Sequence, residues 1–181
     1  GGGLNRLQGD RFVPFHQQRE LRSRSISAVY EDTEGTVWIG TGGNGLYRLQ
    51  GDKLSNVGGL GSQKVRALYQ DSKGVMWIGT EEAGLARWEQ GKLTHYTKQE
   101  GLSNNDVRAI HEDKHGNLWI GTGGGGLNRF ADGKFEVFQT PNGLPSDYFR
   151  ALWEDRDGVL WIGTGGGLSR LKDGQFDRYT I

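Results

Sequence analysis

TVWIGT occupies residues 36–41 of the chain. The segment recurs three times with small changes, as VMWIGT at 75–80, NLWIGT at 117–122 and VLWIGT at 159–164. The spacings between its tryptophans are 39, 42 and 42 residues, at Trp38, Trp77, Trp119 and Trp161. Self-similarity with a period of about 40 residues indicates a repeat architecture. We therefore expect the four tryptophans to hold equivalent structural positions.

The first half of each repeat predicts a β-hairpin. It begins with a short β-rich run, named strand A, at residues 26–30, 65–69, 107–111 and 149–153. An Asp-x-x-Gly turn follows, in which Asp bonds nearby backbone amides and Gly takes a positive φ. The turn aspartates are Asp32, Asp71, Asp113 and Asp155. We predict that they form turns rather than bind calcium, because no further oxygen ligands stand at loop-like spacing. The chain then reverses into strand B, which carries the tryptophan.

The second half of each repeat predicts another hairpin. After a glycine-rich link, strand C reads Gly-Leu-x-Arg-apolar at residues 45–49, 84–88, 126–130 and 167–171. Strand D alternates apolar and polar residues, as a half-buried strand does, at 53–57, 92–96, 134–138 and 175–179. The links 123–126 and 165–167 are glycine-rich, but no Lys-Ser/Thr follows them, so we interpret them as hairpin links rather than phosphate loops.

These four short strands per repeat predict an all-β fold, a β-propeller of four-stranded antiparallel blades. Four repeats are full, and residues 3–7 and 11–15 match strands C and D of an N-terminal half-blade. We predict a single propeller domain or propeller fragment over 1–181. Its predicted parts are a half-blade at 1–25 and blades at about 26–64, 65–106, 107–148 and 149–181.

The half-blade has no strands A and B, so the repeats do not close a ring by the usual pairing of the two termini. The sequence indicates a fragment or an engineered piece of a longer propeller. An open ring exposes strand edges and apolar blade faces, which favour association with another copy. We therefore expect self-association through the incomplete blade.

Composition narrows the function classes. The chain has 22 basic and 22 acidic residues and a formal net charge of zero, which argues against nucleic acid as a partner. It has no cysteine, which removes disulfide and thiol chemistry. No apolar run reaches the roughly 18 residues that a membrane span needs, so we expect no membrane segment in this chain.

The repeat unit V-R-A-L/I-x-E-D-x-x-G-x-L/V-W-I-G-T-x-G-G-L-x-R resembles the two-component regulator propeller repeat. GLSNN at 101–105 and GLPS at 143–146 extend the resemblance, which covers essentially the whole chain. In that family such repeats form extracytoplasmic sensor regions of bacterial hybrid histidine kinases, many of which respond to oligosaccharides. The resemblance implies a non-catalytic, ligand-sensing propeller that binds an oligosaccharide or another small ligand. It also implies a periplasmic or extracytoplasmic location in the parent protein.

Two other function classes stay open. The chain is a structural self-assembly module if several copies complete a ring. Related repeats also occur in propellers similar to streptogramin lyases, which require a metal-supported acid and base. The histidines are poorly placed for this lyase chemistry, since His111 ends strand A and His115 lies in the following turn. We therefore predict no catalytic residue, no metal site and no cofactor.

A specific ligand site is expected where the repeats differ. In a propeller the D-to-A and B-to-C connections share one face, and these connections vary most here. The second residue of strand A is an arginine in three blades, able to offer donor forks to carboxylates or sugar hydroxyls. The predicted ligand-contacting residues are Arg66, Arg108, Arg150, Glu81, Glu82, Asn105, Asp106, Asp147 and Tyr148.

The strand C arginines recur in every repeat, so we assign them to packing rather than to binding. Their aliphatic stems are expected to cover tryptophan rings while their guanidinium groups meet neighbouring carboxylates. They are Arg6, Arg48, Arg87, Arg129 and Arg170.

Overall fold

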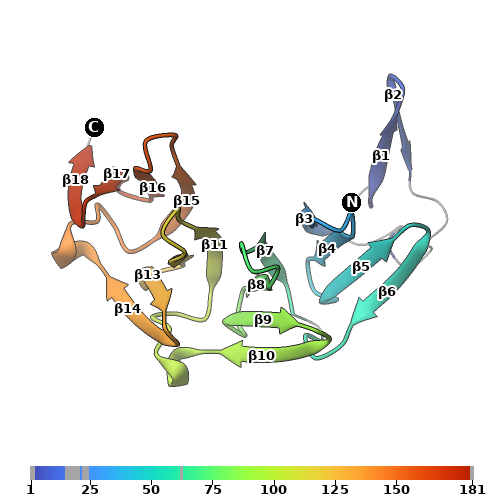
Figure 1. The fold of residues 1–181 in the computed structure, drawn as a ribbon, viewed down its shortest axis with the longest axis horizontal. Helices are drawn as coiled ribbons and strands as arrows, with labels where there is room; N and C mark the ends of the chain where they lie inside the picture. The colour runs from blue at the N-terminus through green and yellow to red at the C-terminus, as the bar shows by residue number, and fades with distance from the viewer. Residues whose placement is uncertain (1–2, 15–20, 22–24, 62, 180–181) are drawn as a thin grey trace. The chain divides into compact units, whose positions relative to one another are not determined.

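The computed structural model describes residues 3–14, 21, 25–61 and 63–179. In these residues it has eighteen strands, which form a two-stranded hairpin and four four-stranded antiparallel sheets (Figure 1). The predicted all-β propeller with four full blades and an N-terminal half-blade is confirmed. The hairpin consists of β1 (Asn5–Gln8) and β2 (Arg11–Pro14). Phe15, which was assigned to the second of these strands, lies outside the described residues.

Each blade meanders from strand A to strand D in chain order. Blade 1 comprises β3 (Ile26–Glu31), β4 (Val37–Thr41), β5 (Leu46–Gln50) and β6 (Lys53–Val57). Blade 2 comprises β7 (Val65–Gln70), β8 (Met76–Thr80), β9 (Leu85–Glu89) and β10 (Lys92–Tyr96). Blade 3 comprises β11 (Val107–Glu112), β12 (Leu118–Thr122), β13 (Gly126–Ala131) and β14 (Lys134–Phe138). Blade 4 comprises β15 (Phe149–Glu154), β16 (Leu160–Thr164), β17 (Gly167–Lys172) and β18 (Gln175–Tyr179). Short 3-10 turns, η2 (Lys98–Glu100) and η3 (Thr140–Asn142), precede blades 3 and 4.

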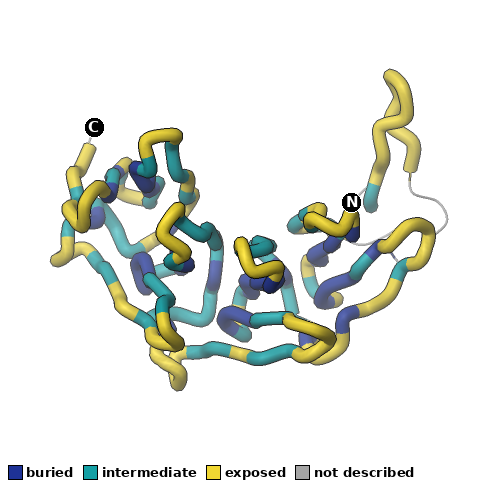
Figure 2. The backbone as a smooth tube through the Cα atoms, in the orientation of Figure 1, coloured by how far each residue is buried: buried dark blue, intermediate teal, exposed yellow. Residues whose placement is uncertain are grey.

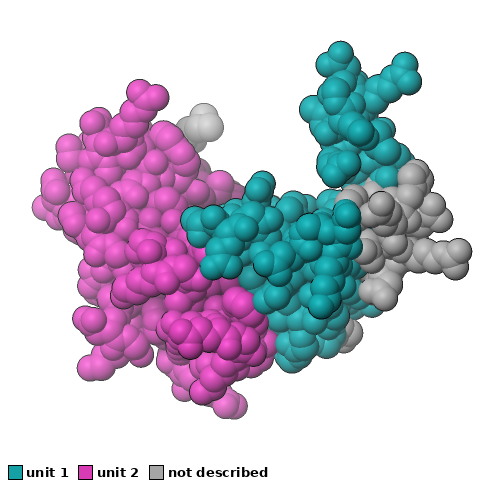
Figure 3. Space-filling model, turned by 45° about the vertical axis from the view of Figure 1, so that its right-hand side comes forward, with its two compact units in different colours: residues 1–65 teal, residues 66–181 magenta. Residues whose placement is uncertain are grey.

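The chain divides into two compact units, Gly1–Val65 and Arg66–Ile181 (Figure 3). The first unit has a core of Leu21, Ile39, Tyr47 and Leu49. The second unit has two cores, each formed between neighbouring blades. The assignment of residues 1–181 to a single domain stays a prediction.

The turn aspartate of each blade closes the A-to-B hairpin through both carboxylate oxygens. In blade 3, Asp113 Oδ2 accepts a hydrogen bond of 2.7 Å from Trp119 Nε1. Its Oδ1 accepts from the amides of His115 and Asn117 at 2.9 Å. Gly116 completes the turn with φ of 81°, a left-handed value that favours glycine. The same indole-to-carboxylate bond occurs in the other blades, at Asp32–Trp38, Asp71–Trp77 and Asp155–Trp161. We name this arrangement the Asp–Trp clasp.

Neighbouring blades pack through two different faces. We define the rear face as the one that contacts the next blade, and the front face as the one that contacts the preceding blade. In the core between blades 3 and 4, Trp119 and Leu127 come from the rear face of blade 3, while Phe149, Ile162 and Leu171 come from the front face of blade 4. The core between blades 2 and 3 uses the equivalent residues Trp77, Leu85, Val107, Ile120 and Phe130.

The glycines of the Trp-Ile-Gly-Thr segments in blades 2 and 3 leave space for the next blade. A Cβ added at Gly79 would lie 2.6 Å from the Val107 side chain, and one added at Gly121 would lie 2.0 Å from Phe149. Because real Cβ atoms do not approach so closely, any larger residue would push the blades apart. The segment therefore encodes a blade interface as well as a strand.

Glutamates at the ends of strand A connect neighbouring blades at the A-to-B turns. Glu112 accepts hydrogen bonds from the amide and the hydroxyl of Ser72, at 2.6 and 2.9 Å. Glu154 contacts His111 Nε2 at 3.0 Å, and the His111 ring packs against Tyr69 at 5.7 Å. His111 thus takes part in packing between blades 2, 3 and 4.

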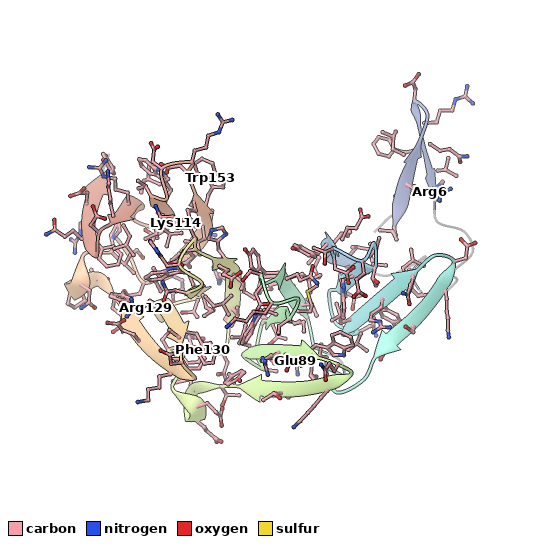
Figure 4. All side chains as sticks on the ribbon, in the orientation of Figure 1. Arg6, Glu89, Lys114, Arg129, Phe130 and Trp153 are labelled. Atoms are coloured by element: carbon pink, nitrogen blue, oxygen red, sulfur yellow. The ribbon has the colours of Figure 1, made fainter. Side chains whose placement is uncertain are left out.

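The strand C arginines follow the packing prediction in part. Arg48 and Arg87 lie over the Trp38 and Trp77 rings, 5.7 and 6.0 Å from the centroids. Arg170 instead lies over Tyr179 at 5.9 Å. Three carboxylates pair with these arginines from within the same blade, in the pairs Arg87–Glu89, Arg129–Glu136 and Arg170–Asp177. Arg6 is exposed on the hairpin (Figure 4).

Burial differs between the blades (Figure 2). Trp38, Trp77 and Trp119 are at most 5% exposed, whereas Trp161 is half-buried. The rear faces that bear Trp77 and Trp119 contact another blade, while the rear face of blade 4 is open to solvent. Blade packing therefore accounts for the difference in burial of an otherwise equivalent side chain.

We predict that Trp119→Ala lowers the free energy of unfolding by about 3 to 5 kcal/mol, because it removes a large buried ring. Trp161→Ala is the matched variant, since it loses the same clasp bond but less burial, and it should cost about 1 to 2 kcal/mol. Urea denaturation followed by far-UV circular dichroism measures both. Equal losses would contradict the interblade role of Trp119.

We also predict acid sensitivity from the clasps. Burial alone would raise the pKa of Asp113, but hydrogen bonds from Trp119, Asn117 and His115 outweigh burial and hold this pKa below its usual value. Hydrogen bonds from Trp161 and Val159 likewise lower the pKa of Asp155. The stability that these lowered pKa values contribute is fully present above the unfolded-state pKa of about 4. It is lost as pH falls through the lowered folded-state value.

The measurement is the free energy of unfolding in urea between pH 7 and pH 2.5. Asp113→Asn should be less stable than the parent at pH 7 and should lose less stability on acidification. A parallel pH dependence in the two proteins would show that the Asp113 clasp does not contribute to it.

Candidate functional site

The predicted loop face brings four of the predicted ligand-contacting residues into one ion-pair network. Arg66, the second residue of β7, contacts Glu81 of the B-to-C link in its own blade. Its Nε lies 3.0 Å from Oδ1 of Asp106, which precedes β11. Arg108 of β11 donates from Nε and Nη2 to Asp106 Oδ2, at 3.0 and 2.8 Å. The Asp106 carboxylate is therefore shared by guanidinium groups from blades 2 and 3.

The two halves of this network differ in geometry. The Arg66 and Asp106 side chains are 28% and 19% exposed. Although Arg66 Nε and Asp106 Oδ1 are within ion-pair distance, both atoms are buried without a hydrogen bond, because the contact is misaligned. The two hydrogen bonds from Arg108 to Asp106 Oδ2 are aligned, so they form the more strongly directed half of the network.

A glycine link separates this network from an exposed aromatic ring. A Cβ added at Gly123 would lie 2.2 Å from Asp106 Oδ2, and one added at Gly124 would lie 3.4 Å from Cζ of Tyr148. Gly123 also pairs with Tyr148 in an isolated antiparallel bridge. The link between β12 and β13 thus has the carboxylate of Asp106 on one side and Tyr148, 58% exposed, on the other. The contact at Gly123 requires glycine, because a side chain would occupy the space of the Asp106 carboxylate, whereas at Gly124 the φ of 95° favours glycine.

Tyr148 and Arg150 are the repeat equivalents of Asp106 and Arg108. Each pair consists of the residue before strand A and the second residue of that strand. In blade 3 the pair is closed by hydrogen bonds, whereas in blade 4 both side chains are exposed. In the part of the chain that the structure describes, the Arg150 guanidinium has no carboxylate within ion-pair distance.

The remaining predicted site residues either form hydrogen bonds within a loop or are exposed. Asn105 Oδ1 accepts a hydrogen bond from the Lys98 amide at 3.0 Å. Asp147 Oδ1 accepts from the amide and hydroxyl of Thr140 at 2.7 and 2.9 Å. These two side chains stabilise the loops before β11 and β15. Glu82 is exposed beside Glu81.

Two interblade crevices lie at the opposite end of the blades, where sequence reasoning placed no site. One, of about 240 Å³, is lined by residues that include Trp119, Arg129, Glu154 and Lys172. The other, of about 320 Å³, is lined by the equivalent Trp77, Arg87 and Glu112, with Phe130. Their common lining indicates that both follow from blade packing. The Glu-Asp dipeptides before the turns, at 112–113 and 154–155, are the sequence signal for these junctions.

Among the described residues, no three or more His, Cys, Asp or Glu side chains are grouped so that they could hold a metal ion. In the same part of the chain, no helix has the length and apolar character needed to cross a bilayer.

The network leads to a prediction on stability. Asp106→Ala leaves two guanidinium groups without their shared carboxylate and should cost about 1 to 3 kcal/mol. Arg108→Ala should cost less, about 0.5 to 1 kcal/mol, because Arg66 can still neutralise Asp106. Arg150→Ala is the control and should change stability by less than about 0.5 kcal/mol. Urea denaturation gives all three values, and a larger cost for Arg108→Ala than for Asp106→Ala would contradict the shared carboxylate.

The chain matches a known family and several solved structures. The profile of the family described as two component regulator propeller matches residues 20–43, 59–82, 101–124 and 143–166. The extracellular domain of the putative hybrid two-component system BT3049 from B. thetaiotaomicron is 27% identical, with a TM-score of 0.86. The match covers 100% of this chain and 26% of that one. The chain therefore spans about a quarter of that relative. A search of curated proteins gives no match.

Two further structures share the fold at 22% identity. The extracellular domain of the putative hybrid two-component system BT4673 from B. thetaiotaomicron has a TM-score of 0.72, with 86% of this chain and 24% of that chain covered. Virginiamycin B lyase from Staphylococcus aureus also has a TM-score of 0.72, with 87% and 56% covered. At this identity the likeness concerns the fold alone. The family match covers all four strand A and strand B hairpins. The chain belongs to the two-component regulator propeller family.

Proposed function

We propose that this propeller is a non-catalytic sensor module that binds an oligosaccharide, or another small polar ligand, on the loop face around Tyr148 and Arg150. The observation that carries the proposal is the open Tyr148–Arg150 pair at a position where blade 3 has a closed ion pair. A repeated scaffold gains a specific site where one repeat departs from the others. Here the departure exposes a ring and a cation together.

The chemistry of this region suits a sugar. The exposed ring of Tyr148 offers an apolar surface for stacking, and its hydroxyl can also donate or accept a hydrogen bond. Arg150 offers a planar fork of donors to hydroxyl or carboxylate oxygens. The neighbouring Asp106–Arg108 pair adds a fixed carboxylate and guanidinium on the other side of the glycine link. A ligand with both an apolar ring face and several polar groups would use all of these contacts.

The relatives support a sensing role in the parent protein. The extracellular domains of two putative hybrid two-component systems share this fold, one of them along the whole length of this chain. We therefore propose a periplasmic or other extracytoplasmic location for the parent of this propeller.

A lyase function has less support from the described residues. The similarity to virginiamycin B lyase shows the fold only. His111 is engaged with Glu154 and Tyr69, His115 lies in an A-to-B turn, and His95 is exposed on β10. None of these histidines lies on the loop face. His16 is outside the described residues. We propose no catalytic residue.

The proposed site is tested with a panel of neutral and acidic oligosaccharides, first by thermal shift and then by titration calorimetry. A ligand of this class should raise Tm, since binding to the folded state alone stabilises it. Tyr148→Ala should then weaken binding about tenfold, the loss of one stacking contact, with little change in stability. Arg150→Gln should also weaken it.

Trp153→Ala is the matched control, because Trp153 is 61% exposed and lies at the other end of β15 (Figure 4). It should leave the affinity unchanged. A ligand whose affinity falls for Trp153→Ala but not for Tyr148→Ala binds elsewhere and would overturn the placement. The absence of binding across the panel would overturn the oligosaccharide class.

A further inference from the structure

The rear face of blade 4 has the residues of an interblade contact but is exposed. Leu168 and Tyr179 are 40% and 43% exposed, and Trp161 is half-buried. The equivalent leucines of blades 2 and 3, Leu85 and Leu127, are both fully buried against the next blade. We name the surface formed by Trp161, Leu168 and Tyr179 the open rear face.

The surroundings of Gly163 also indicate that the rear face of blade 4 is exposed. A Cβ added at Gly163 would meet only Ala151 of its own blade, at 3.6 Å or more. At Gly79 and Gly121 the added atom would instead meet the next blade at 2.6 and 2.0 Å. The backbone of blade 4 at Gly163 therefore leaves open the space that a side chain of the next blade fills at Gly79 and Gly121.

The N-terminal hairpin has the complementary residues. Leu7 of β1 and Phe12 of β2 are directly opposite each other in the strand register, and they are 59% and 77% exposed. Their repeat equivalents are the cross-strand pairs Phe130–Phe135 in blade 3 and Leu171–Phe176 in blade 4. The hairpin thus presents the outer half of a front face to solvent.

The internal interfaces show how these two surfaces meet. Phe130 and Phe135 pack on Tyr96 of the preceding blade, with ring centroids 5.2 and 5.9 Å apart. Phe176 packs on Phe138 at 5.5 Å. Tyr96 and Phe138 hold the position that Tyr179 occupies in blade 4. A hairpin placed on the open rear face would therefore bring Phe12 against Tyr179 and Leu7 toward Trp161.

We propose that the open rear face binds the β1–β2 hairpin of a second copy of this chain. The contact is head-to-tail, because the two surfaces are different parts of the molecule. It repeats an interface that the chain already forms between its own blades. An isolated two-stranded hairpin is marginally stable in water, so docking would also stabilise β1 and β2. Heterologous contacts of this kind propagate into rings or open filaments. The proposal does not depend on the ligand site.

The test is the absolute mass in solution, by light scattering behind a sizing column over a range of concentrations. The parent chain should associate beyond its 20.0 kDa mass as concentration rises. Leu168→Glu and Phe12→Glu should each weaken association at least about tenfold, since each places a charge in an apolar contact. Tyr179→Glu is a second variant of the same face. The control is Val137→Glu, which changes a 37% exposed residue of β14 outside both surfaces.

Mixing the variants identifies the geometry. The Phe12→Glu chain keeps an intact rear face and the Leu168→Glu chain keeps an intact hairpin, so together they should form a one-to-one dimer although neither associates alone. A monomeric parent at every concentration would overturn the proposal. Loss of association in Leu168→Glu but not in Phe12→Glu would also overturn it, because two rear faces would then pair. Tyr148→Ala should leave association unchanged, which separates this result from the outcome of the ligand test.

Discussion

In each blade a turn carboxylate accepts hydrogen bonds from a tryptophan indole and from two backbone amides, and the remaining packing depends on this contact. The amide bonds close the A-to-B hairpin, and the indole bond fixes the ring on the rear face. One aspartate therefore couples the local turn to the hydrophobic core. Because its distance to the indole varies only from 2.7 to 2.8 Å, the tryptophan is held in the same way in each blade.

A tryptophan fixed on the rear face is buried only if the next blade can approach it. The glycine two residues after the tryptophan provides this access, since Val107 and Phe149 occupy the space where a Cβ at Gly79 or Gly121 would lie. Glu112 and Glu154, at the ends of strand A in blades 3 and 4, then connect these blades to the preceding blade. The Trp-Ile-Gly-Thr repeat thus encodes contacts between blades as much as the blades themselves, which explains why repeat proteins gain stability from neighbours.

The strands could be predicted from the sequence because turn residues and period-2 alternation determine them locally. The four D strands were placed at the bounds that the structure shows, from Lys53–Val57 to Gln175–Tyr179. The sharing of Asp106 by Arg66 and Arg108 could not be predicted, since it depends on how two blades stack. The internal hydrogen bonds of Asn105 and Asp147 depend on loop conformation, which sequence alone did not provide.

Repetition also helps to separate structural residues from residues available for function. A residue that recurs in every blade with the same contact, such as the clasp aspartate, is explained by folding. The residue before strand A is different, because it is Lys64, Asp106 or Tyr148 in successive blades. With Asp106 the following arginine is neutralised within the protein, and with Tyr148 it is left exposed beside a ring. The residue at one repeat position thus distinguishes a closed ion pair from the exposed surface where we propose ligand binding, while the blade beneath it keeps the same clasp.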